Sequence, residues 1–290
     1  MEKYREIKQV ILGRRTIDGA GVKLTRIFSH DTIKLLDPFL LLDNFGSDKP
    51  EDYLAGFPWH PHRGIETITY MKSGEVDHED SLGNKGTIRK GDVQWMTAGS
   101  GIIHQEMPQK TKGVLSGFQL WVNLPAKEKM CKPRYNGILA SDIPELEVYP
   151  GVKVKVLAGS VGKTHGPVKD LYVDITYLDF SLEARKGLER KTDPKHTAFA
   201  YVYEGDATFG VGDGEVHAGT GSLLVFGEGD KVGAKSGANG AKFLLVTGKP
   251  LREPVAWGGP IVMNTEAEIK TAFSEIEAGT FIKVKPAGIK

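Results

Sequence analysis

Short runs of alternating apolar and polar residues recur along most of the chain, and glycine-containing turns separate them. Three examples are "GIETITYMKSG" at 64–74, "GFQLWVNLP" at 117–125 and "LYVDITYLDFSL" at 171–182. A period of two is typical of strands with one buried face, and short strands joined by such turns favour a β-sandwich or barrel over alternating strands and helices. The 36 glycines are dispersed between these runs, as many tight turns require. We therefore predict an all-β fold.

The strand pattern occurs twice, which indicates two similar domains. Both "TYMKSGEVDHED" at 69–80 and "YVYEGDATFG" at 201–210 read as a strand, a glycine-containing turn and a second strand. The segment "PAKEKMCKPRYNGI" at 125–138 is polar, carries two prolines and lacks alternation, so we interpret it as a connector. We expect two tandem antiparallel β-barrels, one in residues 1–130 and one in residues 131–290.

One segment near the C-terminus predicts a short helix. It is "TEAEIKTAFSEIEAG" at 265–279. Thr265 can cap its start, Glu268 completes a capping box with Thr265, and Gly279 can end it.

The bulk composition excludes several classes of function. The formal net charge is +1, so the chain lacks the basic excess that marks proteins which bind nucleic acid directly. Cys131 is the only cysteine, which excludes a disulfide framework and a cysteine-built zinc site. No apolar run approaches the roughly 20 residues that span a bilayer, and "MEKYREIKQV" at the start lacks the apolar core of a signal peptide. We expect a cytoplasmic protein without a membrane partner.

Two pairs of ligand-type residues lie at strand spacing. His60 and His62 stand two residues apart in "FPWHPHRGIETITY", and His104 and Glu106 stand two residues apart in "GIIHQEMP". Residues i and i+2 of a strand point to the same face, so each pair can present both side chains to one ion. Imidazole and carboxylate ligands suit iron, manganese, nickel, copper or zinc, and such a set leaves coordination positions open for catalysis.

The stretch that contains both pairs resembles the pirin family. The resemblance is carried by "FPWHPHRGIETITY" at 57–70, "HEDSLGNKGTIRKGDVQWMTAGSGIIHQEMP" at 78–108 and "GFQLWVNLP" at 117–125. It implies a bicupin, with two jelly-roll-like β-barrels in tandem. It also implies that the first barrel binds one divalent transition metal, Fe(II), through His60, His62, His104 and Glu106, without an organic cofactor.

Other residues remain candidates for the metal site. The wider cupin pattern H-x-H-x3-E fits "HPHRGIE" and makes Glu66 an alternative ligand, because alternation would place it on the same face as both histidines. His78, in "VDHEDS", could also approach the site. The histidines of the second half are isolated, so we predict that the second barrel binds no metal; they are His165, His196 and His217.

Aromatic and apolar residues beside the ligands are candidate pocket walls, although ordinary barrel core is the favoured interpretation for most of them. They are Phe57, Trp59, Trp95, Met96, Phe118 and Trp121. We interpret Arg63 as solvated, His30 as a loop residue and Cys131 as a buried, inert thiol.

The resemblance implies an activity, the oxygenative ring cleavage of flavonols such as quercetin by a quercetin 2,3-dioxygenase. Glu106 would accept the proton of the flavonol hydroxyl, and the substrates would be a flavonol and dioxygen. The alternative is a non-catalytic regulatory protein, whose iron senses redox state and whose surface binds a protein partner. An enzyme needs a pocket open to a flavonol, whereas a regulator needs a partner that prefers one oxidation state of the iron.

Overall fold

The computed structural model of the 290-residue chain describes residues 3–285. These residues form two compact units that do not follow a single cut in the sequence. The unit that we call the N-terminal barrel contains residues 15–30, 39–140 and 251–285, and the unit that we call the C-terminal barrel contains residues 3–14, 31–38 and 141–250. The expected boundary after residue 130 therefore differs from the observed division, in which each end of the chain joins the barrel formed mainly by the other half.

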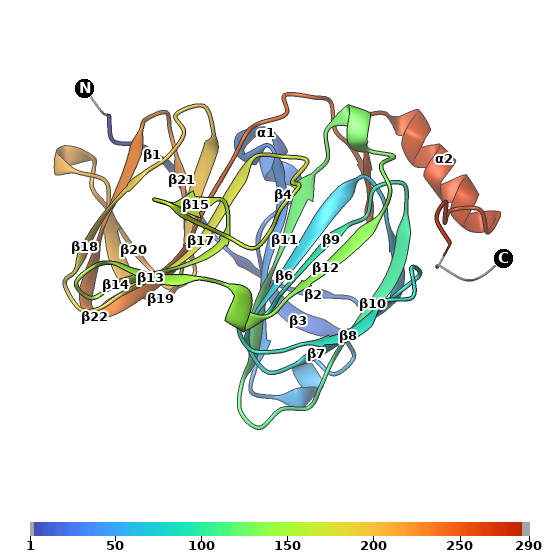
Figure 1. Ribbon diagram of the computed structural model, residues 1–290, viewed down its shortest axis with the longest axis horizontal. Helices are drawn as coiled ribbons and strands as arrows, with labels where there is room; N and C mark the ends of the chain where they lie inside the picture. The colour runs from blue at the N-terminus through green and yellow to red at the C-terminus, as the bar shows by residue number, and fades with distance from the viewer. Residues whose placement is uncertain (1–2, 286–290) are drawn as a thin grey trace. The chain divides into compact units, whose positions relative to one another are not determined.

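Two antiparallel sheets make up most of the N-terminal barrel (Figure 1). The larger sheet has the strand order β12-β9-β6-β11-β4-β3-β2, and the smaller has the order β5-β10-β7-β8. Their strands are β2 Arg14–Asp18, β3 Val22–Phe28, β4 Phe39–Ser47, β5 Phe57–His62, β6 Ile65–Ser73, β7 Val76–Asp80, β8 Lys85–Ile88, β9 Val93–Thr97, β10 Ile102–Pro108, β11 Leu115–Asn123 and β12 Arg134–Ile138.

The presence of β12 corrects the interpretation of residues 125–138 as a connector. Arg134–Ile138 pairs in register with β9, so this part of the segment is an edge strand of the larger sheet. Its polarity misled the sequence reading, because an edge strand is only half covered and tolerates polar side chains on its open side.

A single large sheet folds into the C-terminal barrel, with the path β1-β21-β19-β22-β17-β14-β13; β18 also pairs with β22, and β20 pairs with β19. A small β15-β16 pair completes it. The strands are β1 Ile7–Leu12, β13 Glu145–Tyr149, β14 Val152–Ala158, β15 Ser160–Val161, β16 Thr164–His165, β17 Ile175–Leu182, β18 Gly187–Lys191, β19 Thr197–Phe209, β20 Val216–Gly219, β21 Ser222–Phe226 and β22 Lys231–Gly248.

The last segment of the N-terminal barrel contains the hairpin β23–β24, Ala256–Gly258 and Ile261–Met263, followed by helix α2, Glu266–Glu277. The predicted capping box is confirmed, because Thr265 and Glu268 exchange side-chain-to-backbone hydrogen bonds, and Gly279 follows in the left-handed conformation. The other helices are short: α1 Ile33–Leu36 and the 3-10 turns η1 His30–Thr32, η2 Pro50–Asp52, η3 Ala126–Glu128, η4 Ala140–Asp142 and η5 Gly212–Gly214.

The prediction of an all-β protein with two β-barrels and a short C-terminal helix is confirmed. Within residues 3–285, no helix is both long enough and apolar enough to cross a membrane.

Candidate metal centre

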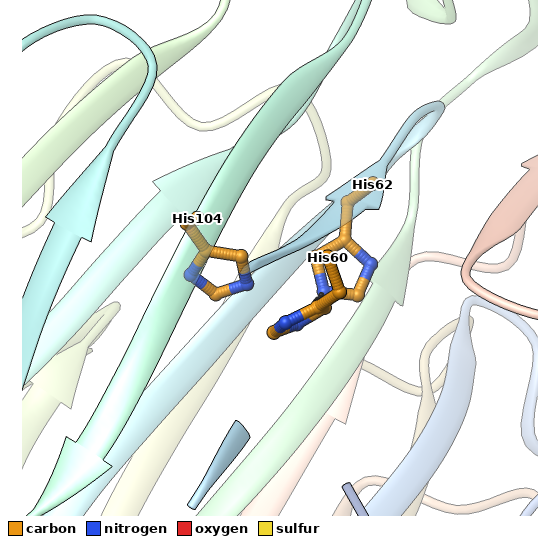
Figure 2. A group of neighbouring side chains, drawn as sticks. All are labelled: His60, His62 and His104. Atoms are coloured by element: carbon orange, nitrogen blue, oxygen red, sulfur yellow. Dashed lines mark hydrogen bonds between the residues drawn. The ribbon is translucent and has the colours of Figure 1, made fainter. Parts of the chain in front are cut away.

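Three histidines meet inside the N-terminal barrel. Strands β5 and β10 pair so that His60 lies directly opposite His104, and His62 follows two residues along β5. Figure 2 shows the three rings turned toward one another, and their nearest ligand nitrogens all lie within 4.8 Å of one another. The i, i+2 spacing seen in the sequence thus produces the convergence that it predicted for these histidines.

Backbone carbonyls orient two of the rings. His60 Nδ1 lies 2.8 Å from the Pro58 carbonyl oxygen, and His62 Nδ1 lies 3.1 Å from the Pro260 carbonyl oxygen. A carbonyl only accepts hydrogen bonds, so each Nδ1 carries the proton and each neutral ring keeps its lone pair on Nε2. The two Nε2 atoms face each other at 3.1 Å. Two lone pairs at that separation repel unless a cation lies between or beside them.

The third histidine strengthens this reading. Both ring nitrogens of His104 are buried without a hydrogen-bond partner among the described residues. Burial, with the neighbouring histidines His62, His60 and His78 as further causes, holds the pKa of His104 well below its ordinary value. Burial and then the charge of His60 lower the pKa of His62 to about 3. Neutral imidazoles with converging lone pairs are the form in which histidine binds metals, so these residues fit a divalent transition metal.

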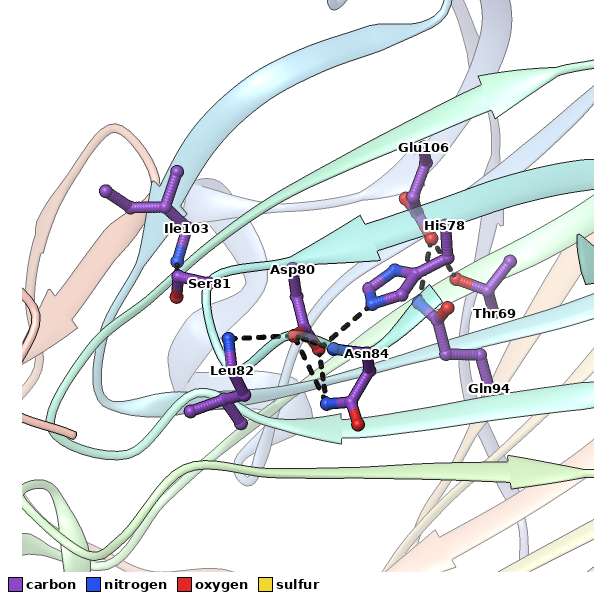
Figure 3. A network of polar contacts seen from close by, with 9 residues as sticks. All are labelled: Thr69, His78, Asp80, Ser81, Leu82, Asn84, Gln94, Ile103 and Glu106. Carbon is purple, nitrogen blue, oxygen red and sulfur yellow. Dashed lines mark hydrogen bonds and ion pairs between the residues drawn. The ribbon is translucent and has the colours of Figure 1, made fainter. Parts of the chain in front are cut away.

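Glu106 lies on the same strand as His104 and is buried, with 4% of its surface exposed. Its carboxylate is outside the group of three converging nitrogens. Three donors hold it in place, as Figure 3 shows for two of them: Oε1 accepts from Thr69 Oγ1 at 2.9 Å and Gln94 Nε2 at 3.0 Å, and Oε2 accepts from Gln119 Nε2 at 2.8 Å. This cradle matches the acceptor-only chemistry of a carboxylate.

The donors to Glu106 belong to a polar row that crosses five strands in register. Arg26 of β3 lies opposite Asp43 of β4, which lies opposite Gln119 of β11; Gln119 lies opposite Thr69 of β6, and Thr69 opposite Gln94 of β9. Residues directly opposite in neighbouring strands share a face of the sheet. We call these five residues the polar row. The sequence reading missed it, although a Gln in the middle of the apolar runs "DVQWM" and "GFQLWV" was a visible signal.

An ion-paired cluster ends the polar row. Arg26 Nε and Nη2 donate to the two carboxylate oxygens of Asp43 at 2.9 and 2.8 Å, and Nη2 also donates to Asp18 at 2.5 Å. Burial alone would lower the pKa of Arg26, but its bonds to Asp43 and Asp18 raise it above the ordinary value. Burial raises the pKa of Asp43, and Arg26 partly offsets that effect.

Glu66 does not share a strand with the histidines, so the expectation that alternation places it on their face is wrong. Strand β5 ends at His62 and the chain turns at Gly64, whose φ is +76°, before β6 begins at Ile65. A Cβ at position 64 would lie 2.0 Å from the Val262 carbonyl oxygen, which explains the glycine. Glu66 accepts from Thr97 Oγ1 at 2.6 Å, and burial raises its pKa.

His78 is buried on β7, where it lies opposite Glu106. Its Nε2 lies 3.1 Å from Asp80 Oδ2, and its ring stacks on Tyr135 at 4.6 Å between centroids. Asp80 also accepts from Asn84 and from the backbone of the turn that follows (Figure 3). The structure therefore ties His78 to a neighbouring network, with its ring centroid 5.5 Å from that of His104.

A cleft of about 590 Å³ opens onto His60 and His62. Of the expected pocket walls, Phe57, Trp59 and Trp121 line it. The other three are buried side chains outside its lining, as their alternative reading proposed: Trp95, Met96 and Phe118. The volume lies within the 300–1,000 Å³ typical of small-molecule sites.

The comparisons with known proteins agree with this architecture. Residues 21–122 match the family model described as Pirin, and residues 177–282 match the model described as Pirin C-terminal cupin domain. The chain belongs to the pirin family. The tandem cupin fold expected of a pirin is thereby confirmed.

Relatives of this pirin carry two kinds of name. A Pseudomonas aeruginosa protein provisionally named quercetin 2,3-dioxygenase is 43% identical over 283 residues, which cover 96% of this chain and 99% of that protein. A pirin-like protein of Caulobacter vibrioides is 42% identical over 278 residues, with the same coverage of 96% and 99%.

Solved structures share the fold of this pirin. The crystal structure of a quercetin 2,3-dioxygenase from Acinetobacter baumannii aligns with a TM-score of 0.89 at 32% identity, covering 96% of this chain and 99% of that one. A bacterial pirin from Escherichia coli, solved in complex with nickel(II), aligns with a TM-score of 0.64 at 19% identity and covers 83% of this chain and 99% of that one.

The C-terminal segment of this pirin contributes to the site in a way that the sequence reading missed. Besides the Pro260 carbonyl that holds His62, Trp257 lines the cleft and stacks on His30 at 3.7 Å between ring centroids. No local pattern signals a contact between residues that lie so far apart in the chain.

The C-terminal segment also contacts Arg63, the residue after His62. The environment of Arg63 differs from the expected one. We expected a solvated side chain, but Arg63 is only 2% exposed. Its guanidinium donates to the Ser100 carbonyl at 2.8 Å, to Glu275 of α2 at 2.7 Å and to the Phe281 carbonyl at 3.0 Å. A buried guanidinium is stable only with such a full set of acceptors.

The remaining expected residues lie outside the group of three histidines, although His30 lines the cleft. His30 lies in the 3-10 turn η1, and Cys131 is partly rather than fully buried. Among residues 3–285, His60, His62 and His104 are the only group of three or more potential metal ligands so close together. The metal-free state of the C-terminal barrel stays a prediction.

Proposed function

We propose that this pirin is an iron-dependent dioxygenase that cleaves the heterocyclic ring of flavonols such as quercetin. The observation that carries the proposal is the meeting of three neutral histidines at the edge of an aromatic-lined cleft. The names of the Pseudomonas aeruginosa relative and the Acinetobacter baumannii structure support this choice of substrate.

The residues that would hold one Fe(II) ion are His60, His62, His104 and Glu106. Once bound, such an ion supplies a Lewis acid and an electron-exchange partner for dioxygen. The first shell would consist of three neutral imidazoles and one carboxylate, a set that accepts several divalent metals, so we name iron as part of the proposal.

Glu106 would also act on the substrate, as the base that takes the proton of the flavonol hydroxyl. Its hydrogen bonds to Thr69, Gln94 and Gln119 fix the carboxylate while it does so. In the overall reaction one flavonol and one dioxygen give one carbon monoxide and one ester, which is the product of ring opening. Both dioxygen atoms remain in the ester, and the proton held by Glu106 returns to it.

The aromatic walls would bind the planar ring system and exclude water. Trp121 and Trp257 lie with ring centroids 5.9 Å apart, and Trp121 meets His62 edge to face at 5.0 Å. This ring wall leads from the cleft to the histidines. Flat apolar surfaces beside a few convergent polar groups are typical of sites for aromatic ligands.

The test is carbon monoxide release from quercetin in air by fully iron-loaded protein, with Glu106→Gln and Glu66→Gln as matched variants. Loss of a general base costs about 10²- to 10⁴-fold in rate, so Glu106→Gln should be at least about 100-fold slower, and Glu66→Gln should retain most of the rate. Metal analysis of each variant separates loss of the base from loss of iron.

Two outcomes would contradict the proposal. No carbon monoxide from wild-type protein that holds a full equivalent of iron would favour the redox-sensing regulator instead. A larger loss in Glu66→Gln than in Glu106→Gln would transfer the role of the base to Glu66.

A further inference from the structure

One part of the cleft lining contains a carboxylate, that of Asp18, which has no role in the proposed reaction. The end of β2 and the turn that follows it form one segment, which contributes Asp18, Gly19 and Ala20. It is fixed to the strand that carries the histidines. Ala20 N donates to the Gly56 carbonyl at 3.0 Å, and a Cβ on Gly19, whose φ is +56°, would lie 2.6 Å from Phe57 Cδ1. The position of Asp18 relative to β5 is therefore built into the fold.

The carboxylate of Asp18 retains capacity to accept hydrogen bonds. Oδ1 accepts from Gly19 N at 2.7 Å, and Oδ2 accepts from Arg26 at 2.5 Å. A carboxylate has about four acceptor positions, so about half of them remain open. The side chain is 46% exposed and lines the cleft.

The charges of the cleft favour a donor over an anion at this place. Its charged lining residues are Asp18, Asp43 and Arg26, with a formal sum of −1. Arg26 has two of its donor nitrogens directed at the two carboxylates. A ligand carboxylate or sulfate placed beside Asp18 would be repelled by that carboxylate, whereas a hydroxyl could donate to it.

We propose that Asp18 accepts a hydrogen bond from a phenolic hydroxyl of the bound substrate. In this proposal the hydroxyl belongs to the pendant ring, so the cleft would select planar aromatics that carry hydroxyls on that ring as well as on the ring that is cleaved. This inference rests on the proposed function and deepens it by naming the residue that discriminates between flavonols. The aromatic wall supplies affinity for any flat ring system, and Asp18 supplies the preference among them.

The test compares quercetin with 3,5,7-trihydroxyflavone, which is the same flavonol without the two hydroxyls of its pendant ring. Binding to metal-loaded protein under nitrogen is measured by quenching of tryptophan fluorescence, since Trp59, Trp121 and Trp257 line the cleft. Hydrogen bonds to charged groups are worth about 10-fold or more in affinity. Partial exposure reduces this, so quercetin should bind about 5- to 10-fold more tightly.

Asp18→Asn should remove most of that preference by weakening the binding of quercetin alone. Asp48→Asn, an exposed aspartate outside the cleft, is the matched control and should leave both affinities unchanged. Asp18→Asn preserves size, and Arg26 keeps both bonds to Asp43. The melting temperature of each variant verifies folding.

Each remaining outcome overturns the inference in a distinguishable way. Equal affinity of the two flavonols for wild-type protein would refute it without reference to any variant. An unchanged preference in Asp18→Asn would refute the role of Asp18 and leave the proposed activity intact, provided that both flavonols bind and release carbon monoxide in air. Failure of both flavonols to bind would refute the inference and the proposed function together.

Discussion

The two barrels of this pirin differ most in what they bury. The interior of the C-terminal barrel is a continuous apolar cluster that includes Val154, Phe180, Val202 and Phe243. The N-terminal barrel includes several smaller apolar clusters, and it also buries many polar groups. Its buried polar residues include His62, Glu66, Thr67, Thr69, His78, Asp80, Gln94, His104 and Glu106.

This difference shows how one architecture can serve two purposes. In the C-terminal barrel, inward side chains contribute apolar burial, at roughly 25 cal/mol for each Å² removed from water. In the N-terminal barrel many buried positions hold hydrogen-bonding groups, each of which must find a partner because an unpaired buried polar group costs about 1–3 kcal/mol. Residues of the polar row form these hydrogen bonds across neighbouring strands. His60 and His62 form them with backbone carbonyls, and by our proposal the histidines also bind a metal.

The largest expected effect tests whether only the N-terminal barrel binds metal, by removing a histidine from each barrel. His104→Ala should reduce the bound metal from about one equivalent to background, because metal sites lose affinity steeply with each ligand. His217→Ala, in the C-terminal barrel, should leave the metal content unchanged. The measurement is elemental analysis of both variants after equal loading. Loss of a metal equivalent in His217→Ala would show that the barrels are more alike than we predict.

A smaller effect separates the buried cations of the two barrels. Lys129 in the N-terminal barrel donates to the Gly64 and Val262 carbonyls and to Asn123, and burial lowers its pKa from 10.5 to about 7. Arg5 in the C-terminal barrel also donates to backbone carbonyls, those of Gly227 and His196, but arginine stays charged over the accessible pH range.

The pH dependence of stability should therefore come from Lys129. Between pH 7 and 10.5 the unfolded chain binds the proton that the folded protein releases, so the free energy of unfolding should rise with pH. The slope is up to about 1.4 kcal/mol per pH unit. Denaturant unfolding of wild type and Lys129→Met at pH 7.5 and 9 measures it as the difference between the two proteins. The same slope in both proteins would contradict this assignment.

The smallest expected effect concerns the contribution of one polar side chain, Gln119, to stability and metal affinity. Gln119 donates to Glu106 and accepts from Trp121 Nε1 at 3.2 Å, so it joins the carboxylate to the cleft wall. Gln119→Leu should lower the free energy of unfolding by about 1–2 kcal/mol and weaken metal binding by about tenfold. Denaturant unfolding and metal titration measure these, with the exposed Gln109→Leu as control. Unchanged metal affinity would make Gln119 a purely structural residue.

Local patterns predicted those features that depend on neighbouring residues. The i, i+2 spacing of His60 and His62 and the capping box of Thr265 are such cases, because strand alternation and helix capping act over a few residues. The face on which Glu66 lies was predicted wrongly, because the left-handed turn at Gly64 interrupts the alternation between Glu66 and the histidines.

Features that depend on pairing between distant segments could not be predicted in this way. The cradle of Glu106 exists only because β6, β9 and β11 lie side by side in one register. Arg63 looked solvated because its acceptors, Glu275 and the Phe281 carbonyl, come from the last part of the chain. A sequence shows that a buried arginine would need hydrogen-bond acceptors, but it does not show which distant residues supply them.

The return of residues 251–285 to the N-terminal barrel has a consequence for biosynthesis. A ribosome makes His60, His62 and His104 well before it makes the Pro260 carbonyl that orients His62 and the Glu275 and Phe281 groups that hold Arg63. A nascent or prematurely terminated chain thus carries the histidines without the groups that set their geometry. Completion of the centre accordingly requires that the chain has been synthesised at least as far as Phe281.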